Sequence, residues 1–167
     1  GWQLSQPVAQ IAAEHVAWHS QPIAHNLPVA LTSLIGRERD LAELRQLLAT
    51  TRLLTLAGPG GMGKTRLALQ LAADVLGSFA DGVWLVELAS LSDPALAPAA
   101  LAAALGLRQE HGRPLLATLT DWLRPKQLLL VLDNCEHLVA SCAQLAGSLL
   151  AVCEQLRIVA SSREPLG

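Results

Sequence analysis

The sequence predicts a three-layer α/β fold with a mainly parallel sheet, and three observations favour it. Short apolar runs alternate with segments of helical periodicity along most of the chain. A glycine-rich segment at 58–65 joins the first of these runs to a helix. Apolar residues make up 51% of the 167 residues and charged residues 16%, which suits a buried core better than a disordered chain.

The first 27 residues are expected to form a short helix and a linker. Apolar residues recur at helical spacing from Pro7 to His19, and two prolines and an asparagine follow at 20–28. We therefore divide the chain into this segment, 1–27, and one compact domain, 28–167. The missing initial methionine and the end close to a strand suggest a piece of a larger protein.

The elements of the domain follow from the spacing of apolar residues. Leucines on one face predict a first helix over 38–49. Apolar runs bounded by glycine and polar residues predict the strands, and helical periodicity predicts the segments between them. The expected strands are 52–57, 82–88, 127–132 and 156–161, and the expected helices between them are 64–77, 94–105, 115–123 and 137–153. We expect the strand order 2-3-1-4.

The loop after the first strand has the spacing of a phosphate-binding loop. GPGGMGKT at 58–65 fits the pattern G-x-x-x-x-G-K-[S/T], between a strand and a helix as the pattern requires. Glycines let backbone N–H groups turn toward phosphate oxygens, and the helix start adds partial positive charge. The residues expected to contact the nucleotide here are Gly58, Pro59, Gly60, Gly61, Met62, Gly63, Lys64, Thr65 and Arg66.

Two side chains of this loop predict the ligand to be a nucleoside triphosphate, ATP above all, with Mg²⁺. Lys64 can reach the β- and γ-phosphates as a mobile point charge, and the Thr65 hydroxyl can coordinate the metal. A plain glycine-rich turn is the alternative, but such a turn rarely supplies Lys-Thr at this offset.

An aspartate ends the most apolar strand, at the sheet edge where the loop lies. Asp133 is expected to bind Mg²⁺ through water, as the Walker-B aspartate of P-loop NTPases does; a turn aspartate is the alternative. Hydrolysis also needs a group that orients or deprotonates the attacking water. The next residue is the neutral Asn134, and the nearest other carboxylate is Glu136, for which a helix-start role is an equal alternative.

The last strand brings further polar residues to the same edge. Ser161, Ser162 and Arg163 end the run at 158–163, and Arg163 could sense the γ-phosphate, with a solvated loop arginine as the alternative. The candidate catalytic residues are therefore Asp133, Asn134, Glu136 and Arg163, and the candidate metal ligands are Thr65 and Asp133.

Charge and cysteine content exclude several other classes. A net charge of -2 leaves no electrostatic footprint for nucleic acid or an anionic membrane. Three cysteines form no CxxC pair, and the adjacent Cys135, Glu136 and His137 point apart, which disfavours a disulfide scaffold and a zinc site. With no long apolar run and no signal peptide at the start, we expect a cytoplasmic location.

With these motifs in place, the chain resembles the STAND class of P-loop ATPases, specifically the NB-ARC-like module of bacterial AfsR-type and LuxR-type regulators. The resemblance runs from about residue 26 to residue 167. It rests on NLPVALTSLIGRERDL, GPGGMGKTRLALQLA, DGVWLVELASLSDP, LLLVLDNCEHL and IVASSREPLG, in that order. It implies a P-loop NTPase fold of the ASCE, AAA+-like kind.

The resemblance also implies a function and further contacts. Family members are usually switches in which ADP holds a closed state, ATP permits opening and self-oligomerisation, and slow hydrolysis resets the system. Ile35, Gly36 and Arg37 would contact the adenine, and Arg163 would match the sensor arginine. Winged-helix and effector domains of the full-length chain would be partners outside this segment.

Asn134 stands where the family often has a second acid, so slow turnover is expected. Two alternatives stay open: a catalytic AAA+-like ATPase with fast turnover, and a non-hydrolysing interaction module with a vestigial site.

Overall fold

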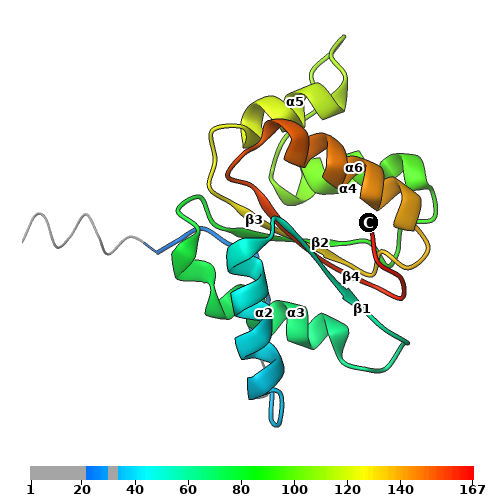
Figure 1. Cartoon of the computed structure of the whole chain (residues 1–167). Helices are drawn as coiled ribbons and strands as arrows, with labels where there is room; N and C mark the ends of the chain where they lie inside the picture. Colours follow the sequence, from blue (N-terminus) through cyan, green and yellow to red (C-terminus); the bar gives the residue numbers. More distant parts are fainter. Residues whose placement is uncertain (1–21, 30–33) are drawn as a thin grey trace, which may run out of the picture.

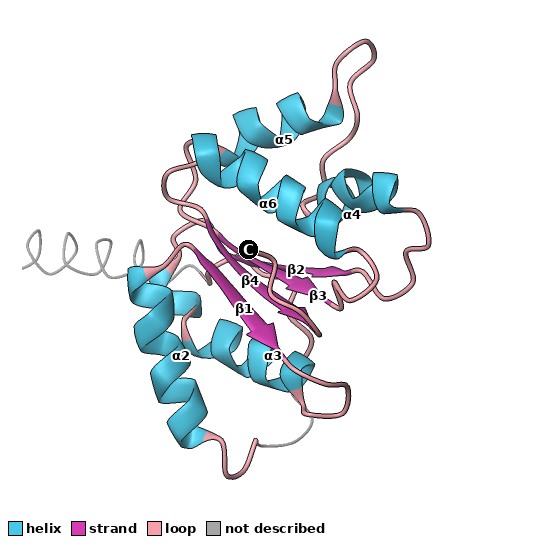
Figure 2. Cartoon of the chain, turned by 45° about the vertical axis from the view of Figure 1, so that its right-hand side comes forward, coloured by secondary structure: helices cyan, strands magenta, loops and turns pink. Residues whose placement is uncertain are grey.

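The computed structural model describes residues 22–29 and 34–167, and it has the predicted three layers (Figure 1). A four-stranded sheet lies between two helices on one face and three on the other (Figure 2). The strands are β1 (Leu53–Ala57), β2 (Val83–Glu87), β3 (Leu129–Asp133) and β4 (Arg157–Ser162). The helix expected at 7–19 falls outside the described residues.

Helices α2 (Glu38–Thr50) and α3 (Lys64–Asp74) cover one face of the sheet. The opposite face is covered by α4 (Ala97–Ala104), α5 (Leu115–Leu123) and α6 (Val139–Val152). The short 3-10 helices η1 (Leu76–Ser78) and η2 (Pro94–Leu96) replace the ends of two expected helices. None of the described helices has the length and apolar character needed to cross a membrane.

The strands are all parallel, and their order is β1-β4-β3-β2. The expected order 2-3-1-4 is therefore wrong, because β4 lies between β1 and β3. The reason is burial: from Ile158 to Ser162 every residue of β4 is buried, whereas three of the five residues of β1 are only half-buried. A strand buried on both faces is best placed inside a parallel sheet.

Strand β3 shows how one apolar run supplies two cores. Leu130 and Leu132 pack against α4, α5 and α6, while Leu129 and Val131 pack against α2 and α3. Each of these four side chains is buried. Successive residues of a strand point to opposite faces, so a continuous apolar run is what a sheet covered on both sides requires.

The segment 22–29 lies along the outer edge of β2. His25 forms a bridge with Val83, and the Asn26 side chain both accepts from the Leu85 amide (2.6 Å) and donates to the Leu85 carbonyl (2.9 Å). Gly82 lies beneath this segment with φ +99°, and a Cβ atom there would be 2.0 Å from the Ala24 carbonyl oxygen. Only glycine fits such a close approach of two backbones.

Candidate nucleotide site

The glycine-rich loop connects β1 to α3 at the carboxyl edge of the sheet. Its first residue is held by the bond from the Gly58 amide to the Ser162 carbonyl (3.2 Å). Gly61 and Gly63 have φ of +84° and +74°, in the left-handed region that side chains disfavour, and Gly63 immediately precedes α3. The loop thus turns sharply and ends at a helix N-terminus, the geometry that favours an anion.

A cavity of about 290 Å³ opens over this loop. It is lined from one side by the loop and the start of α3 and from the other by the segment that follows β3. The lining residues are Gly60, Gly61, Gly63, Lys64, Thr65, Arg66, Asn134 and Glu136. Residues predicted from two distant motifs therefore line one cavity.

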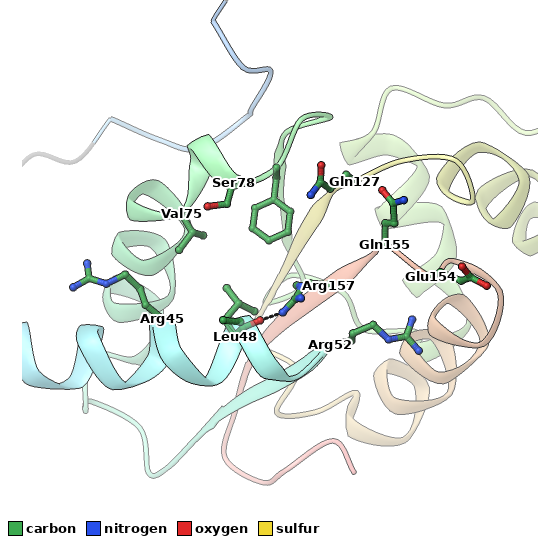
Figure 3. A pocket seen from close by; sticks show the side chains of 11 residues that line it. Arg45, Leu48, Arg52, Val75, Ser78, Gln127, Glu154, Gln155 and Arg157 are labelled. Atoms are coloured by element: carbon green, nitrogen blue, oxygen red, sulfur yellow. Dashed lines mark hydrogen bonds between the residues drawn. The ribbon is translucent and has the colours of Figure 1, made fainter.

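A larger cavity, of about 410 Å³, lies at the opposite ends of the strands (Figure 3). Two arginines that line it bind carbonyl groups at helix C-termini. Arg157 donates to the Leu48 and Thr51 carbonyls at the end of α2. Arg52 donates to two carbonyls at the end of α6. Cationic side chains stabilise helix C-termini. The smaller cavity is the candidate nucleotide site, because the glycine-rich loop with the phosphate-binding pattern lines it.

The Lys64 side chain forms hydrogen bonds with the glycine-rich loop that precedes it. Its ammonium group donates to the Gly58 carbonyl (2.7 Å) and the Pro59 carbonyl (2.9 Å), and its nitrogen lies 3.8 Å from Oε1 of Glu136. The other carboxylate oxygen of Glu136 lies 3.3 Å from Nε of Arg163. Lys64, Glu136 and Arg163 come from three segments and meet beside the cavity.

The two predicted metal ligands are also in contact. The Thr65 hydroxyl donates to Oδ1 of Asp133 at 2.9 Å, and Asp133 is only 6% exposed. The Ser161 hydroxyl donates to the same carboxylate oxygen and accepts from the Asn134 amide (2.9 Å). Hydroxyl and carboxylate oxygens are ligand types that Mg²⁺ takes, so this pair fits that ion.

Ser161 has a larger part than the sequence indicated. The sequence identifies Ser161 only as a polar residue where the last strand ends, at the edge of the sheet. The bond to Asp133 arises because β4 lies directly beside β3, which the expected strand order did not allow. The correct order would have identified this contact.

The segment after β3 turns away from the strand at Asn134. This residue has φ +60°, the one positive value among described non-glycine residues, and asparagine tolerates that conformation better than most. Cys135 follows and is fully buried. Contact with Cys142 and burial raise the pKa of the Cys135 thiol, so Cys135 is a neutral core residue and no nucleophile.

Of the three residues predicted to contact adenine, Ile35, Gly36 and Arg37, only Arg37 has a bond to the glycine-rich loop among the described contacts. Arg37 reaches the phosphate loop, donating to the Met62 carbonyl (2.8 Å), and also pairs with Asp40 (3.1 Å). Gly36 has φ +80°, and the Ile35 side chain is 87% exposed. The structure thus brings Arg37 to the loop, while contact of these three residues with adenine stays a prediction.

One contact beside the site had no signal in the sequence. Nε2 of His137 lies 2.5 Å from the Leu91 carbonyl oxygen, which links the segment after β3 to the segment after β2. The two residues are 46 positions apart, and no local pattern pairs them.

Comparison with known proteins gives a family match over most of the chain. A family model described as "AAA domain" matches residues 25–165. An uncharacterized protein of Mycobacterium tuberculosis is 41% identical over 145 residues, covering 87% of this chain and 37% of the relative. A second protein of that organism, provisionally named an HTH-type transcriptional regulator, is 44% identical over 124 residues, covering 74% and 14%. The chain therefore spans well under half the length of these relatives.

Solved structures show the same fold at low sequence identity. Cdc6p from Pyrobaculum aerophilum superimposes with a TM-score of 0.58 at 19% identity, covering 83% of this chain and 41% of that one. A Signal Transduction ATPase with Numerous Domains (STAND) protein from Pyrococcus horikoshii, which has a tetratricopeptide repeat sensor, gives 0.57 at 16% identity, covering 88% and 24%. Both carry an α/β domain like this one.

Proposed function

Because the chain belongs to the AAA domain family, we propose that it is the ATP/ADP-binding switch of a longer regulatory protein, of the STAND, NB-ARC-like kind, with slow hydrolysis. The observation that carries this proposal is the meeting of Thr65 and Asp133 beneath the glycine-rich loop. A hydroxyl at a helix start and a carboxylate at a strand end are the pair that a Mg-nucleotide site needs.

The residues that carry the proposal have separate roles. The backbone N–H groups of residues 60–65 would bind phosphate oxygens, since Pro59 has no N–H and the Gly58 amide donates to Ser162. Lys64 would exchange its carbonyl partners for the β- and γ-phosphates. Thr65 and Asp133 would hold Mg²⁺, which when bound neutralises charge on the phosphates. Ser161 would keep Asp133 oriented. Ile35, Gly36 and Arg37 would contact the adenine.

Slow turnover is proposed because Asn134, which lines the cavity, is neutral and cannot accept a proton. Asn134 and Glu136 are the candidates for orienting the attacking water, and Arg163 is the candidate sensor of the γ-phosphate. The Glu136 carboxylate at the cavity is a specific reason to expect some hydrolysis rather than none.

A role in signalling and transcription regulation is proposed for the whole protein. The support is the shared segment with a relative named for HTH-type regulation, together with the small share of both relatives that this chain spans. Partners would be other domains of the same chain and, with ATP bound, further copies of it. The net charge of -2 disfavours nucleic acid or membrane contact by this segment, and we propose a cytoplasmic location.

Calorimetry with Mg-ATP tests the proposal. Lys64→Ala should abolish measurable binding, because it removes the ammonium group that the phosphates need. The matched control is Lys126→Ala, which removes an ammonium group lying 4.4 Å from the Trp122 ring centre beyond α5. Equal affinity of the Lys64→Ala variant and the unchanged chain would refute the assignment.

A further inference from the structure

Glu136 lies between two cationic side chains beside the candidate nucleotide site, those of Lys64 and Arg163. One carboxylate oxygen is 3.8 Å from the Lys64 nitrogen, and the other is 3.3 Å from Nε of Arg163. The Glu136 side chain is 26% exposed and that of Lys64 only 12%, so water screens this pair less than a surface pair. One carboxylate thus balances both positive charges.

The bonds of Lys64 leave it a single anionic partner. An ammonium group has three donors, and two of them point at the neutral carbonyls of Gly58 and Pro59. Among the residues that the structure describes, Glu136 is the one carboxylate within ion-pair distance of Lys64.

Arg163 depends on the same carboxylate. The Arg163 side chain is 66% exposed. Among the residues that the structure describes, Glu136 is the one carboxylate that forms an ion pair with it. Nη2 of Arg163 would lie 3.6 Å from a Cβ atom built on Gly60. Glu136 therefore holds this guanidinium close to the phosphate loop.

We propose that the Glu136 carboxylate takes the electrostatic place of a γ-phosphate and thereby sets the preference of the site between nucleoside di- and triphosphates. This inference rests on the proposed function. A triphosphate brings its terminal phosphate to Lys64 and Arg163, so it must displace the carboxylate and is repelled by it. A diphosphate lacks that group and leaves the Glu136–Arg163 pair in place. Glu136 is thus a specificity-determining residue that favours ADP.

Calorimetric dissociation constants for Mg-ATP and Mg-ADP test this inference. Glu136→Gln keeps the shape of the side chain and removes its charge. We expect it to tighten Mg-ATP binding about tenfold, which corresponds to ~1.4 kcal/mol, and to change Mg-ADP binding less than about twofold. The ATP-to-ADP preference then rises, which a general loss of structure cannot produce.

The matched control is Glu164→Gln, because Glu164 is an exposed carboxylate next to Arg163 without an ion pair in the described part of the chain. It should leave the ATP-to-ADP preference unchanged. If Glu136→Gln fails to fold, Glu136→Asp withdraws the carboxylate by one methylene and should shift the preference in the same direction by a smaller factor.

The outcomes separate the two claims. If the unchanged chain binds neither nucleotide, the proposed function is refuted and this inference with it. If both nucleotides bind and the Glu136 variants leave their ratio as it was, or shift it as Glu164→Gln does, only the inference about Glu136 is overturned.

Discussion

The Thr65 hydroxyl donates a 2.9 Å hydrogen bond to Oδ1 of Asp133, joining the start of α3 to the end of β3 across 68 residues. The same oxygen accepts from Ser161 at the end of β4. Three elements of the fold therefore meet at one buried carboxylate oxygen. Substitutions here should lower the affinity for Mg-ATP more than the affinity for ATP without the metal, and titrations can measure this difference.

Asp133→Asn should weaken Mg-ATP binding about tenfold or more, because an amide replaces the charged oxygen that the metal would need. Binding of ATP in EDTA should change much less, since Lys64 and the loop amides remain. Paired titrations with and without Mg²⁺ measure the difference. The control is Asp121→Asn on α5, which removes an exposed carboxylate that pairs with Arg113. An equal loss under both conditions would contradict a metal role for Asp133.

Ser161→Ala should lower both stability and Mg-ATP affinity. It removes one donor to the buried Asp133 carboxylate and the acceptor of the Asn134 amide. Asp133 keeps its bond from Thr65, but the Asn134 amide loses its acceptor, and an unpaired buried polar group costs about 1–3 kcal/mol. Urea unfolding and calorimetry measure the two effects, with Ser148→Ala on α6 as the control. Wild-type values for both quantities would show that Ser161 does not support Asp133.

These contacts show which parts of the site a sequence can predict. The phosphate loop, its strand and its helix are specified within a few residues, because glycine placement and apolar periodicity are local properties. Asp133 was predicted for the same reason: it follows an apolar run. The bond between Ser161 and Asp133 spans 28 residues, and it depends on which strands lie side by side.

The error in strand order has the same physical origin. Local composition identifies each strand, but which strands lie side by side depends on how two helical layers cover the sheet. The bond of Asn26 to Leu85, across 59 residues, and that of His137 to Leu91 likewise arise only once the chain is folded. Sequence patterns therefore predict the helices and strands better than the contacts between them, and the roles of the site residues stay predictions.

Gly82→Ala should destabilise the fold. The residue has φ +99°, and a Cβ atom there would meet the Ala24 carbonyl oxygen at 2.0 Å, so segment 22–29 must shift from β2. Left-handed strain alone costs about 1–3 kcal/mol. The control is Gly77→Ala, where a Cβ atom meets nothing within 4 Å. Thermal unfolding compares the two, and equal midpoints would show that the contact between segment 22–29 and β2 contributes little.

The last prediction concerns turnover. We expect hydrolysis of ATP below about one per second, toward the slow end of the enzyme range, because the residue after Asp133 is neutral. Among the described residues that line the cavity, Glu136 is the one carboxylate. If it deprotonates the attacking water, Glu136→Gln should lower the single-turnover rate about 100-fold or more.

This loss should occur even though the same substitution is expected to tighten Mg-ATP binding. Rapid-quench measurement at saturating nucleotide separates the rate from the affinity, and Glu164→Gln controls for the loss of one negative charge. A rate unaffected by Glu136→Gln would leave Asn134 as the group that orients water. Glu136 would then act on the choice of nucleotide alone, because its ion pairs with Lys64 and Arg163 do not require it to take part in the chemical step.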